Sequence, residues 1–236
     1  MSWQGNILRV NLSSGDIRSE PLNMEWANDY IGERGLGTKY LWESMDPKAD
    51  PMGPDNVLIF ATGPLTGTNA STSGRYAVIT KGPLTGAIAC SNSGGKFGAE
   101  LKFAGFDLLL IEGRAEKPVY LLIEGDEISL QSADKLWGKT VWETDEWIKK
   151  THHNPLLKIA TIGVAGERGV RYASVVNDLH RAAGRSGVGT VMGSKNLKAI
   201  AVRGTQGVKV KDPKRFMEVT DEMKNLLAEH TGHFPA

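Results

Sequence analysis

The sequence predicts an α+β fold, in which a sheet-rich domain is made of two related β/α halves. The 28 glycines lie mostly in loops between short apolar runs, which is typical of many short strands joined by tight turns. The chain also repeats itself, because a strand, a glycine-rich stretch and a second strand ending in glycine recur in the same order.

The repeat consists of four pairs of segments. These pairs are residues 60–63 with 159–163, 74–78 with 169–173, 94–98 with 184–189, and 111–113 with 202–204. The spacing from Gly98 to Gly113 equals that from Gly189 to Gly204. Two related halves of roughly 90 to 100 residues would place two glycine loops and two arginines around a pseudo-two-fold axis. Chance matching among glycines is the alternative.

The elements follow from local patterns. Residues 7–11 and 17–20 flank a Ser-Ser-Gly-Asp turn and predict an opening hairpin. Helices are predicted over residues 24–44, with a break near Gly35, and over 96–104 and 141–150. Short apolar runs predict further strands at residues 56–61, 75–80, 107–112, 118–124, 127–130, 157–162, 170–176 and 197–203.

The C-terminal segment opens with Asp212 as a helix N-cap and Pro213 in the first turn. One face of this helix is apolar and needs a partner; it carries Phe216, Val219, Met223, Leu226 and Leu227. We therefore divide the chain into a domain of residues 1–208 and a helical start, residues 209–236, of a connection to a further C-terminal body. A satellite helix folded back on the domain is the alternative.

Composition excludes several classes of protein. The net charge is +1 and the basic residues are scattered among acidic ones, which argues against a nucleic-acid partner. The apolar runs are too short for a membrane span and the N-terminus lacks the pattern of a signal peptide, so we expect a cytoplasmic protein with no membrane partner.

Cys90 is the one cysteine, so this chain's thiolates alone cannot hold a cluster. Because Cys90 lies between small apolar residues, it is expected to be structural, with a nucleophile as the alternative.

The two glycine loops are candidates for binding an anion. Glycine-rich turns ahead of a helix expose successive N–H groups, and a nearby guanidinium offers a planar fork to phosphate oxygens; Arg75, Arg181 and Arg185 fit this role. The loop at residues 184–190 lacks the lysine of a nucleotide-binding P-loop, and a dinucleotide fingerprint is also missing. Tight turns in a sheet domain are the alternative.

Several motifs together resemble the family of tungsten aldehyde ferredoxin oxidoreductases. They lie at residues 56–67, 73–76, 81–86, 91–95, 101–106, 180–185 and 192–200, within a likeness that runs from Gly5 to about Gly204. The resemblance implies the N-terminal domain of such an enzyme, on which a tungsten bis-pterin cofactor (tungstopterin, or molybdopterin) lies. It also implies a Mg²⁺ ion that bridges the two pterin phosphates, touched by Asn92 and the carbonyl of Ala182. The cofactor-binding residues implied are Arg75, Asn92, Ser93, Gly94, Gly95, Arg181, Ala182, Gly184 and Arg185.

Members of this family are usually more than twice this length. Their later domains carry the ligands of a 4Fe–4S cluster and the groups that handle protons, so no catalytic residue is expected in this chain and the chain alone is expected to be inactive. The resemblance implies oxidation of an aldehyde substrate to a carboxylate, with electrons passed to ferredoxin or an electron-transfer subunit. The expected partners are the later domains or a companion subunit, and a homo-oligomer is possible. The alternatives are a related tungsten enzyme such as an aromatic acyl-CoA reductase, or a non-catalytic scaffold.

Overall fold

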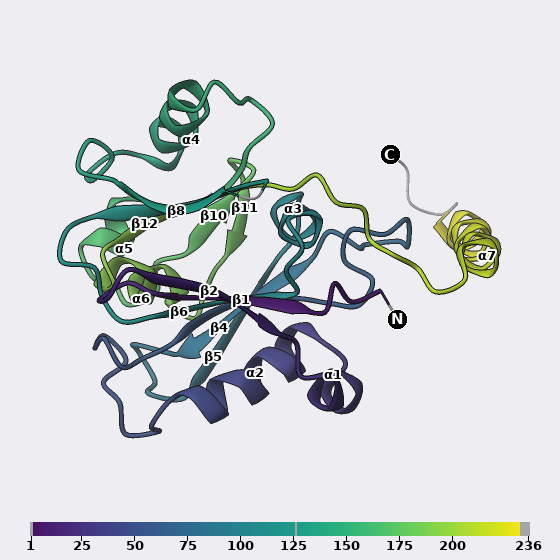
Figure 1. Ribbon diagram of the computed structural model, residues 1–236, viewed down its shortest axis with the longest axis horizontal. Coiled ribbons are helices and arrows are strands. Elements are labelled where there is room, and N and C mark those ends of the chain that lie inside the picture. The colour runs from purple at the N-terminus through teal and green to yellow at the C-terminus, as the bar shows by residue number, and fades with distance from the viewer. Residues whose placement is uncertain (1, 126, 232–236) are drawn as a thin grey trace.

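The computed structural model describes residues 2–125 and 127–231, in which two six-stranded sheets, A and B, lie face to face (Figure 1). Helices α3 (Phe97–Phe103) and α6 (Val188–Ser194) lie between them. Helices α1 (Met24–Tyr30) and α2 (Glu33–Ser44) cover the outer face of sheet A, and α4 (Val141–Thr151) covers that of sheet B. The fold is therefore α+β, as predicted.

Sheet A has the strand order β2-β1-β6-β3-β4-β5. Its strands are β1 (Asn6–Asn11), β2 (Asp16–Pro21), β3 (Leu58–Thr62), β4 (Tyr76–Lys81), β5 (Ile88–Ser93) and β6 (Leu108–Glu112). Only β1 and β6 pair in parallel among the described pairs of this sheet; the others are antiparallel. The opening hairpin is confirmed as β1 and β2.

Sheet B repeats this topology and confirms the internal duplication. Its strands are β7 (Val119–Glu124), β8 (Glu127–Ser132), β9 (Lys158–Thr161), β10 (Val175–Asn177), β11 (Arg181–Ala183) and β12 (Leu197–Arg203). From its hairpin edge the order is β8-β7-β12-β9-β10-β11, and its parallel pair, β7 with β12, corresponds to β1 with β6. Gly98 and Gly189 are each the second residue of a helix between the sheets, so the equal spacing reflects the same helix-to-strand unit.

One paired segment of the predicted repeat is wrong. Residues 170–174 form turns in place of a strand, and Tyr172 is 70% exposed. A Cβ on Gly98 would lie 3.3 Å from the Arg75 carbonyl oxygen, while one on Gly189 would overlap the Ser174 carbonyl group. The counterpart of Arg75 in the second half is therefore Ser174, because the two helices pack on these equivalent strand starts.

The sequence-based elements also differ from the structure at a helix break and at four short elements. The helix predicted over residues 24–44 does break, but at Ile31, which has a φ of 65°, and not at Gly35. Gly35 serves a close approach instead, since a Cβ there would lie 2.5 Å from the Tyr30 carbonyl oxygen. The edge strands β5 and β11 were not predicted, and neither were the helices α5 (Val164–Glu167) and α6.

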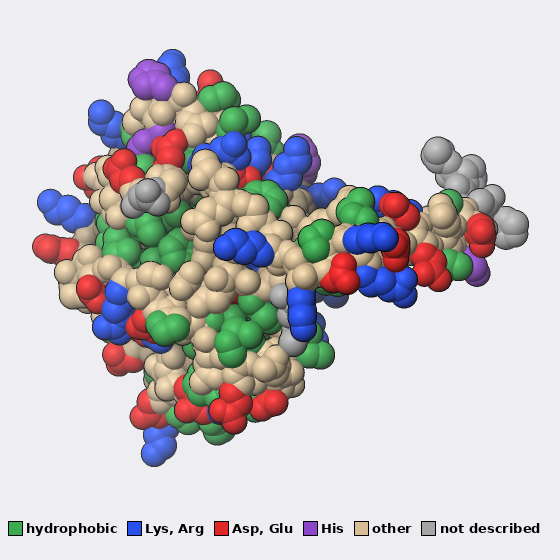
Figure 2. Space-filling model, turned by 45° about the vertical axis from the view of Figure 1, so that its right-hand side comes forward, with side chains coloured by type: hydrophobic (Ala, Val, Ile, Leu, Met, Phe, Trp, Pro, Cys, Tyr) green, Lys and Arg blue, Asp and Glu red, His purple; other side chains and the backbone are tan. Residues whose placement is uncertain are grey.

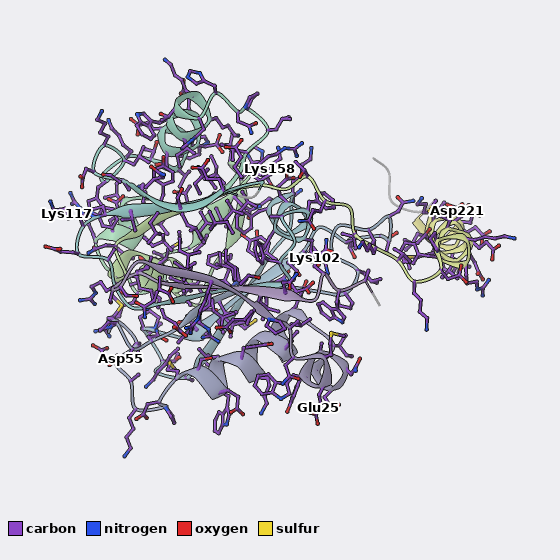
Figure 3. All side chains as sticks on the ribbon, in the orientation of Figure 1. Glu25, Asp55, Lys102, Lys117, Lys158 and Asp221 are labelled. Carbon is purple, nitrogen blue, oxygen red and sulfur yellow. The ribbon has the colours of Figure 1, made fainter. Side chains whose placement is uncertain are left out.

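A buried ion pair fixes the N-terminal segment beside α3. Lys102 Nζ and an Asp107 carboxylate oxygen are 2.8 Å apart, and both side chains are fully buried. Asp107 also accepts hydrogen bonds from the backbone N–H groups of Gln4 and Gly5. Figure 3 labels Lys102 within the body of the domain. The position equivalent to Asp107 in the second half holds Lys198, which pairs with Glu167 and is also buried.

Helix α7 (Pro213–Thr231) projects away from the rest of the domain (Figure 2). The predicted N-cap is confirmed, because the backbone N–H of Arg215 donates to Asp212 Oδ1 at 3.0 Å. The division at residue 208 stays a prediction, and residues 232–236 of the second part lie outside the described residues. Within residues 2–125 and 127–231, no helix combines the length and apolar character needed to span a bilayer.

The Gly98 and Gly189 positions give a matched prediction about stability. A Cβ on Gly189 would lie 2.6 Å from the Ser174 carbonyl carbon, whereas the nearest atom to a Cβ on Gly98 is Tyr76 Cβ at 3.0 Å. We expect Gly189→Ala to lower the free energy of unfolding by about 1–3 kcal/mol through overpacking. Gly98→Ala should cost less, because its shortest contact of 3.0 Å is longer than those at Gly189 and because alanine favours a helix. Urea unfolding of both variants measures the difference; equal losses would contradict it.

Candidate cofactor-binding site

The two predicted glycine loops lie along the seam where an edge strand of each sheet meets the other sheet. β5 is the edge of sheet A, and β11 is the edge of sheet B. Ser91 Oγ in β5 donates to the carbonyl oxygen of Gly184 at 2.7 Å, and Ser186 Oγ donates to the Cys90 carbonyl at 3.5 Å. The loop after β11 therefore lies beside Ser91 and Cys90, whereas Gly94, in the loop after β5, lies beside Asn177 near the start of β11. The two loops, which are far apart in the sequence, thus lie at opposite ends of one seam between the halves.

The amide of Asn177 joins the two halves beneath the first loop. Its Oδ1 accepts hydrogen bonds from Tyr76 Oη at 2.9 Å and from Ser93 Oγ at 2.8 Å. Asn177 also pairs with Arg181 across the β10–β11 ladder, and Tyr76 directly follows Arg75. This register brings Arg75 and Arg181, from opposite halves, to the same end of the two sheets.

Arg75 lies in a polar chain that continues to the first turn of α2. Its Nη1 donates to Asn92 Oδ1, and Asn92 Nδ2 donates to Glu33 Oε2 at 3.1 Å. Burial raises the pKa of Glu33, while the guanidinium groups of Arg75 and Arg34 and the hydrogen bond from Asn92 oppose that rise. Since Glu33 accepts from the Asn92 NH2 group, it fixes the orientation of that amide, with its oxygen toward Arg75. The sequence motifs did not reveal Glu33.

Two hollows flank this first turn of α2. One, of about 370 Å³, is lined in part by Ile31, Glu33, Thr72 and Arg75. The other, of about 500 Å³, is lined in part by Arg34, Thr38, Cys90, Arg185 and Ser186. Cys90 is a half-buried free thiol on the wall of the second hollow.

The arginines of this region are available to a ligand. The side chains of Arg75, Arg181 and Arg185 are exposed. Among the described residues, no carboxylate oxygen lies within 4.0 Å of a nitrogen of these three side chains. Positive charge that is not already paired by the protein suits an anion, and guanidinium groups bind phosphate oxygens in bidentate fashion.

Strained backbone concentrates around the same edge. Most of the described non-glycine residues with positive φ lie here: Ile31, Glu33, Thr72, Asp178, Leu179 and Arg185. Ile31 and Thr72 are β-branched, and for such residues this conformation is a true outlier. Strain of this kind costs about 1–3 kcal/mol per residue and gathers at functional sites, which supports a ligand site at this edge.

The predicted residues thus fall into two neighbouring groups. Arg75, Asn92, Ser93, Gly94 and Gly95 belong to the first half, and Arg181, Ala182, Gly184 and Arg185 belong to the second. Ser93 is 2% exposed and its hydroxyl donates to Asn177, so its side chain is not free to contact a ligand. A Cβ on Gly94 would meet no atom within 4 Å, so protein packing leaves open space beside that residue. Contacts of these residues with a cofactor stay predictions.

A phosphorylated, metal-carrying pterin fits this arrangement. The exposed arginines can neutralise phosphate groups, and the glycine loops leave backbone groups uncovered. Asn92 and the backbone of Ala182 offer the oxygen atoms that Mg²⁺ prefers. Asn92 Oδ1 accepts a hydrogen bond from Arg75, and the second lone pair of this oxygen can face a cation.

Glu33 gives a prediction about how the stability of the fold depends on pH. Because folding raises its pKa, the folded chain holds this proton to higher pH than the unfolded chain does. The free energy of unfolding should therefore fall as the pH rises from the ordinary glutamate range through the raised pKa. Glu33→Gln should remove that part of the fall, which denaturant unfolding at stepped pH would measure. An identical pH slope in both proteins would be evidence against this assignment.

Comparison with known proteins identifies related chains. The profile described as "Aldehyde ferredoxin oxidoreductase, N-terminal domain" matches residues 7–204. The chain is 57% identical over 220 residues to a tungsten-containing aldehyde ferredoxin oxidoreductase of Pyrococcus horikoshii, covering 93% of this chain and 36% of that protein. It is 54% identical over 226 residues to the protein of that name from Pyrococcus furiosus, covering 96% and 37%. The chain thus spans about a third of the length of these curated relatives.

More distant relatives carry other names. The WOR-like subunit of an aliphatic sulfonate oxidoreductase from Pyrococcus furiosus is 34% identical over 243 residues, covering 97% of this chain and 38% of that subunit. Among solved structures, the active site complex BamBC of benzoyl coenzyme A reductase, in complex with 1,5 dienoyl-CoA, matches with a TM-score of 0.96 and 37% identity. That match covers 98% of this chain and 35% of the other.

Proposed function

Since the chain belongs to the aldehyde ferredoxin oxidoreductase family through its N-terminal domain, we propose that it binds the tungsten bis-pterin cofactor of an enzyme that oxidises aldehydes to carboxylates. The observation that carries this proposal is the placing of two glycine loops, with exposed arginines from both halves, along one seam of the duplicated fold. The relatives from Pyrococcus horikoshii and Pyrococcus furiosus are named as tungsten-containing, and a tungsten pterin is the cofactor that this name implies.

The role of the chain would be to hold and orient the cofactor. Arg75, Arg181 and Arg185 would neutralise its phosphates, the loops at residues 93–96 and 184–187 would contact it through backbone groups, and Asn92 with Ala182 would contact Mg²⁺. When bound, the tungsten would accept the electron pair released as an aldehyde and water give a carboxylate and protons. The pterin sulfurs would hold the metal, so no tungsten ligand is required from this chain.

Partners follow from the length of the relatives. Those proteins extend well beyond the region matched here, so we propose that further domains or a companion subunit carry the 4Fe–4S cluster and the proton-handling groups. Electrons would then pass through that cluster to ferredoxin or an electron-transfer subunit. We propose a cytoplasmic location for the complete enzyme.

Elemental analysis tests the proposal. The chain, purified without air from a host that makes the cofactor, is expected to contain tungsten or molybdenum together with pterin, measured by fluorescence after oxidation. Freshly isolated, folded protein that contains neither would overturn the proposal and favour a non-catalytic scaffold.

An acyl-CoA reductase is the second candidate, favoured by the fold match to the benzoyl coenzyme A reductase complex. The identities of 54–58% to the aldehyde ferredoxin oxidoreductases exceed the 37% to that structure and favour aldehyde oxidation. Assays of the complete protein with an aldehyde and a viologen dye, and with an aromatic acyl-CoA and a reductant, separate the two candidates.

Helix α7 is expected to seek a partner. Met217, Val219 and Leu226 on this projecting helix are 44%, 38% and 51% exposed. We expect the chain of residues 1–236 to self-associate or bind a hydrophobic dye, because such surface is usually covered in a stable protein. Leu226→Lys should reduce dye fluorescence, whereas Leu156→Lys, at a 54% exposed site outside α7, should not. A clean monomer that binds no dye would contradict the prediction.

A further inference from the structure

Asn177 belongs to the second half, but its side-chain amide forms hydrogen bonds with polar groups of the first half. Its side chain is at the end of β10 and the residue is 1% exposed. Besides accepting from Tyr76 and Ser93, it donates through Nδ2 to the Gly94 carbonyl oxygen at 2.9 Å and to Asp178 Oδ2 at 3.0 Å. Both hydrogens and both lone pairs of one amide are thereby used, so this group fits its place closely.

Asp178, the next residue after Asn177, contacts the following residues of the glycine loop. Its Oδ2 accepts a hydrogen bond from the backbone N–H of Lys96 at 2.6 Å. A Cβ on Gly95 would overlap the same carboxylate oxygen and would lie 2.8 Å from Asn177 Nδ2. Gly95 itself has a φ of 92°, and the backbone that presents the carboxylate is strained, with φ of 46° at Asp178 and 64° at Leu179.

These contacts matter for ligand binding, because without them the backbone of the glycine loop could adopt many conformations. Two successive glycines lose more conformational entropy on ordering than any other pair of residues. A loop that is already ordered loses less on binding, so the ligand is held more tightly. The strained Asp178–Leu179 turn is therefore explained if its carboxylate has to reach the loop.

We infer that Asn177 and Asp178 are positioning residues, by which the second half holds the glycine loop at residues 93–96 of the first half in the shape that receives the cofactor. The inference rests on the proposed function and extends it to residues that touch the loop and not the ligand. The first half thereby depends on the second for its share of the site.

Asp178 is the residue to change, since Asn177→Ala would strand buried hydroxyl groups and endanger folding. Asp178→Ala removes the acceptor for the Lys96 N–H, whereas Asp178→Asn keeps an oxygen of the same shape and tolerates positive φ. Asp134→Ala is the matched control: Asp134 is exposed, lies in the same half and makes one local hydrogen bond with Ser132.

Hydrogen exchange of the full chain, resolved by residue, gives the first readout. Asp178→Ala should speed exchange of the Lys96 amide about 10-fold or more, the effect of losing a charge-assisted hydrogen bond. Amides in β4 should keep their rates. Asp178→Asn should fall between wild type and Asp178→Ala, and Asp134→Ala should match wild type. An unchanged Lys96 amide in Asp178→Ala would overturn the inference, whether or not the chain binds a pterin.

Pterin content is the second readout and separates the inference from the proposed function. Asp178→Ala should retain about 10-fold less pterin than wild type after the same wash, with Asp178→Asn recovering most of the loss. If wild type itself holds no pterin, the proposed function fails and the exchange experiment alone decides the inference. If wild type holds pterin and Asp178→Ala holds as much, the loop does not need positioning and the inference is refuted.

Discussion

Replacement of both Arg75 and Arg181 by alanine is expected to lower pterin retention by about 10²- to 10⁴-fold. Each exposed guanidinium would donate charge-assisted hydrogen bonds to a phosphate, worth about 1.5–3 kcal/mol apiece, and each 1.4 kcal/mol corresponds to a factor of about ten. Because the two residues come from different halves, each single variant should retain part of the affinity. Pterin and tungsten content after repeated washing measures the loss.

Arg18→Ala is the matched control for this experiment. Arg18 is also exposed, but it lies on β2, the edge of sheet A opposite β5. Its removal should leave pterin content unchanged. All these variants should unfold at nearly the wild-type denaturant concentration, because exposed side chains contribute little to stability. Normal pterin content in both single variants, Arg75→Ala and Arg181→Ala, would remove the basis of the site assignment.

Asp107→Ala is expected to lower the free energy of unfolding by about 3–5 kcal/mol, the usual result of breaking a buried ion pair by removing one partner. The change leaves the Lys102 ammonium fully buried without its counter-charge. It also leaves the N–H groups of Gln4 and Gly5 without their acceptor. Burial already lowers the pKa of Lys102 against the influence of Asp107, so the variant should favour the neutral amine further. Denaturant unfolding followed by circular dichroism measures the effect.

Two further variants test the cause of this loss. Gln4 and Gly5 donate to different oxygens of Asp107, so Asp107→Asn keeps an acceptor for one of them and should cost less than Asp107→Ala. Glu43→Ala breaks an ion pair with Lys39 that lies on the surface of α2, and should cost no more than about 0.5 kcal/mol. If the free energy of unfolding of Asp107→Ala lies within about 1 kcal/mol of the wild-type value, the buried pair contributes little to stability.

The central strands were predictable because they read as continuous apolar runs. β3 and β6 are covered by helices on both faces of sheet A, and such strands lose the alternation of polar and apolar residues. β5 and β11 were missed for the opposite reason. β5 contains Ser91, Asn92 and Ser93, and β11 has only three residues. Their polar groups are satisfied by partners about 90 residues away, such as Gly184 for Ser91, which no local pattern reveals.

The site was predictable only in part for the same reason. Glycine content and the family motifs indicated Arg75, Asn92, Arg181 and the two loops, because these residues lie within short sequence motifs. Glu33 and Asn177 act on those residues from other elements, and each reads in the sequence as an ordinary polar residue near a turn. The pairing of residues 74–78 with 169–173 was wrong, because it followed a repeated Arg-Tyr dipeptide. The packing of Gly189 on Ser174, which identifies the true counterpart of Arg75, cannot be seen in the sequence.

The duplicated topology also sets the order in which the chain can acquire structure during synthesis. Each sheet uses one uninterrupted stretch of chain, from β1 to β6 and from β7 to β12. On the ribosome, all strands of sheet A are available to pair once Glu112 has emerged. The side chains of Phe97 and Leu101 on α3 are then still exposed, because Val188 and Val191, which share their core, have not yet been synthesised. A finished first half with an uncovered apolar face is the species most open to aggregation or chaperone capture, and elongation through α6 closes that interval.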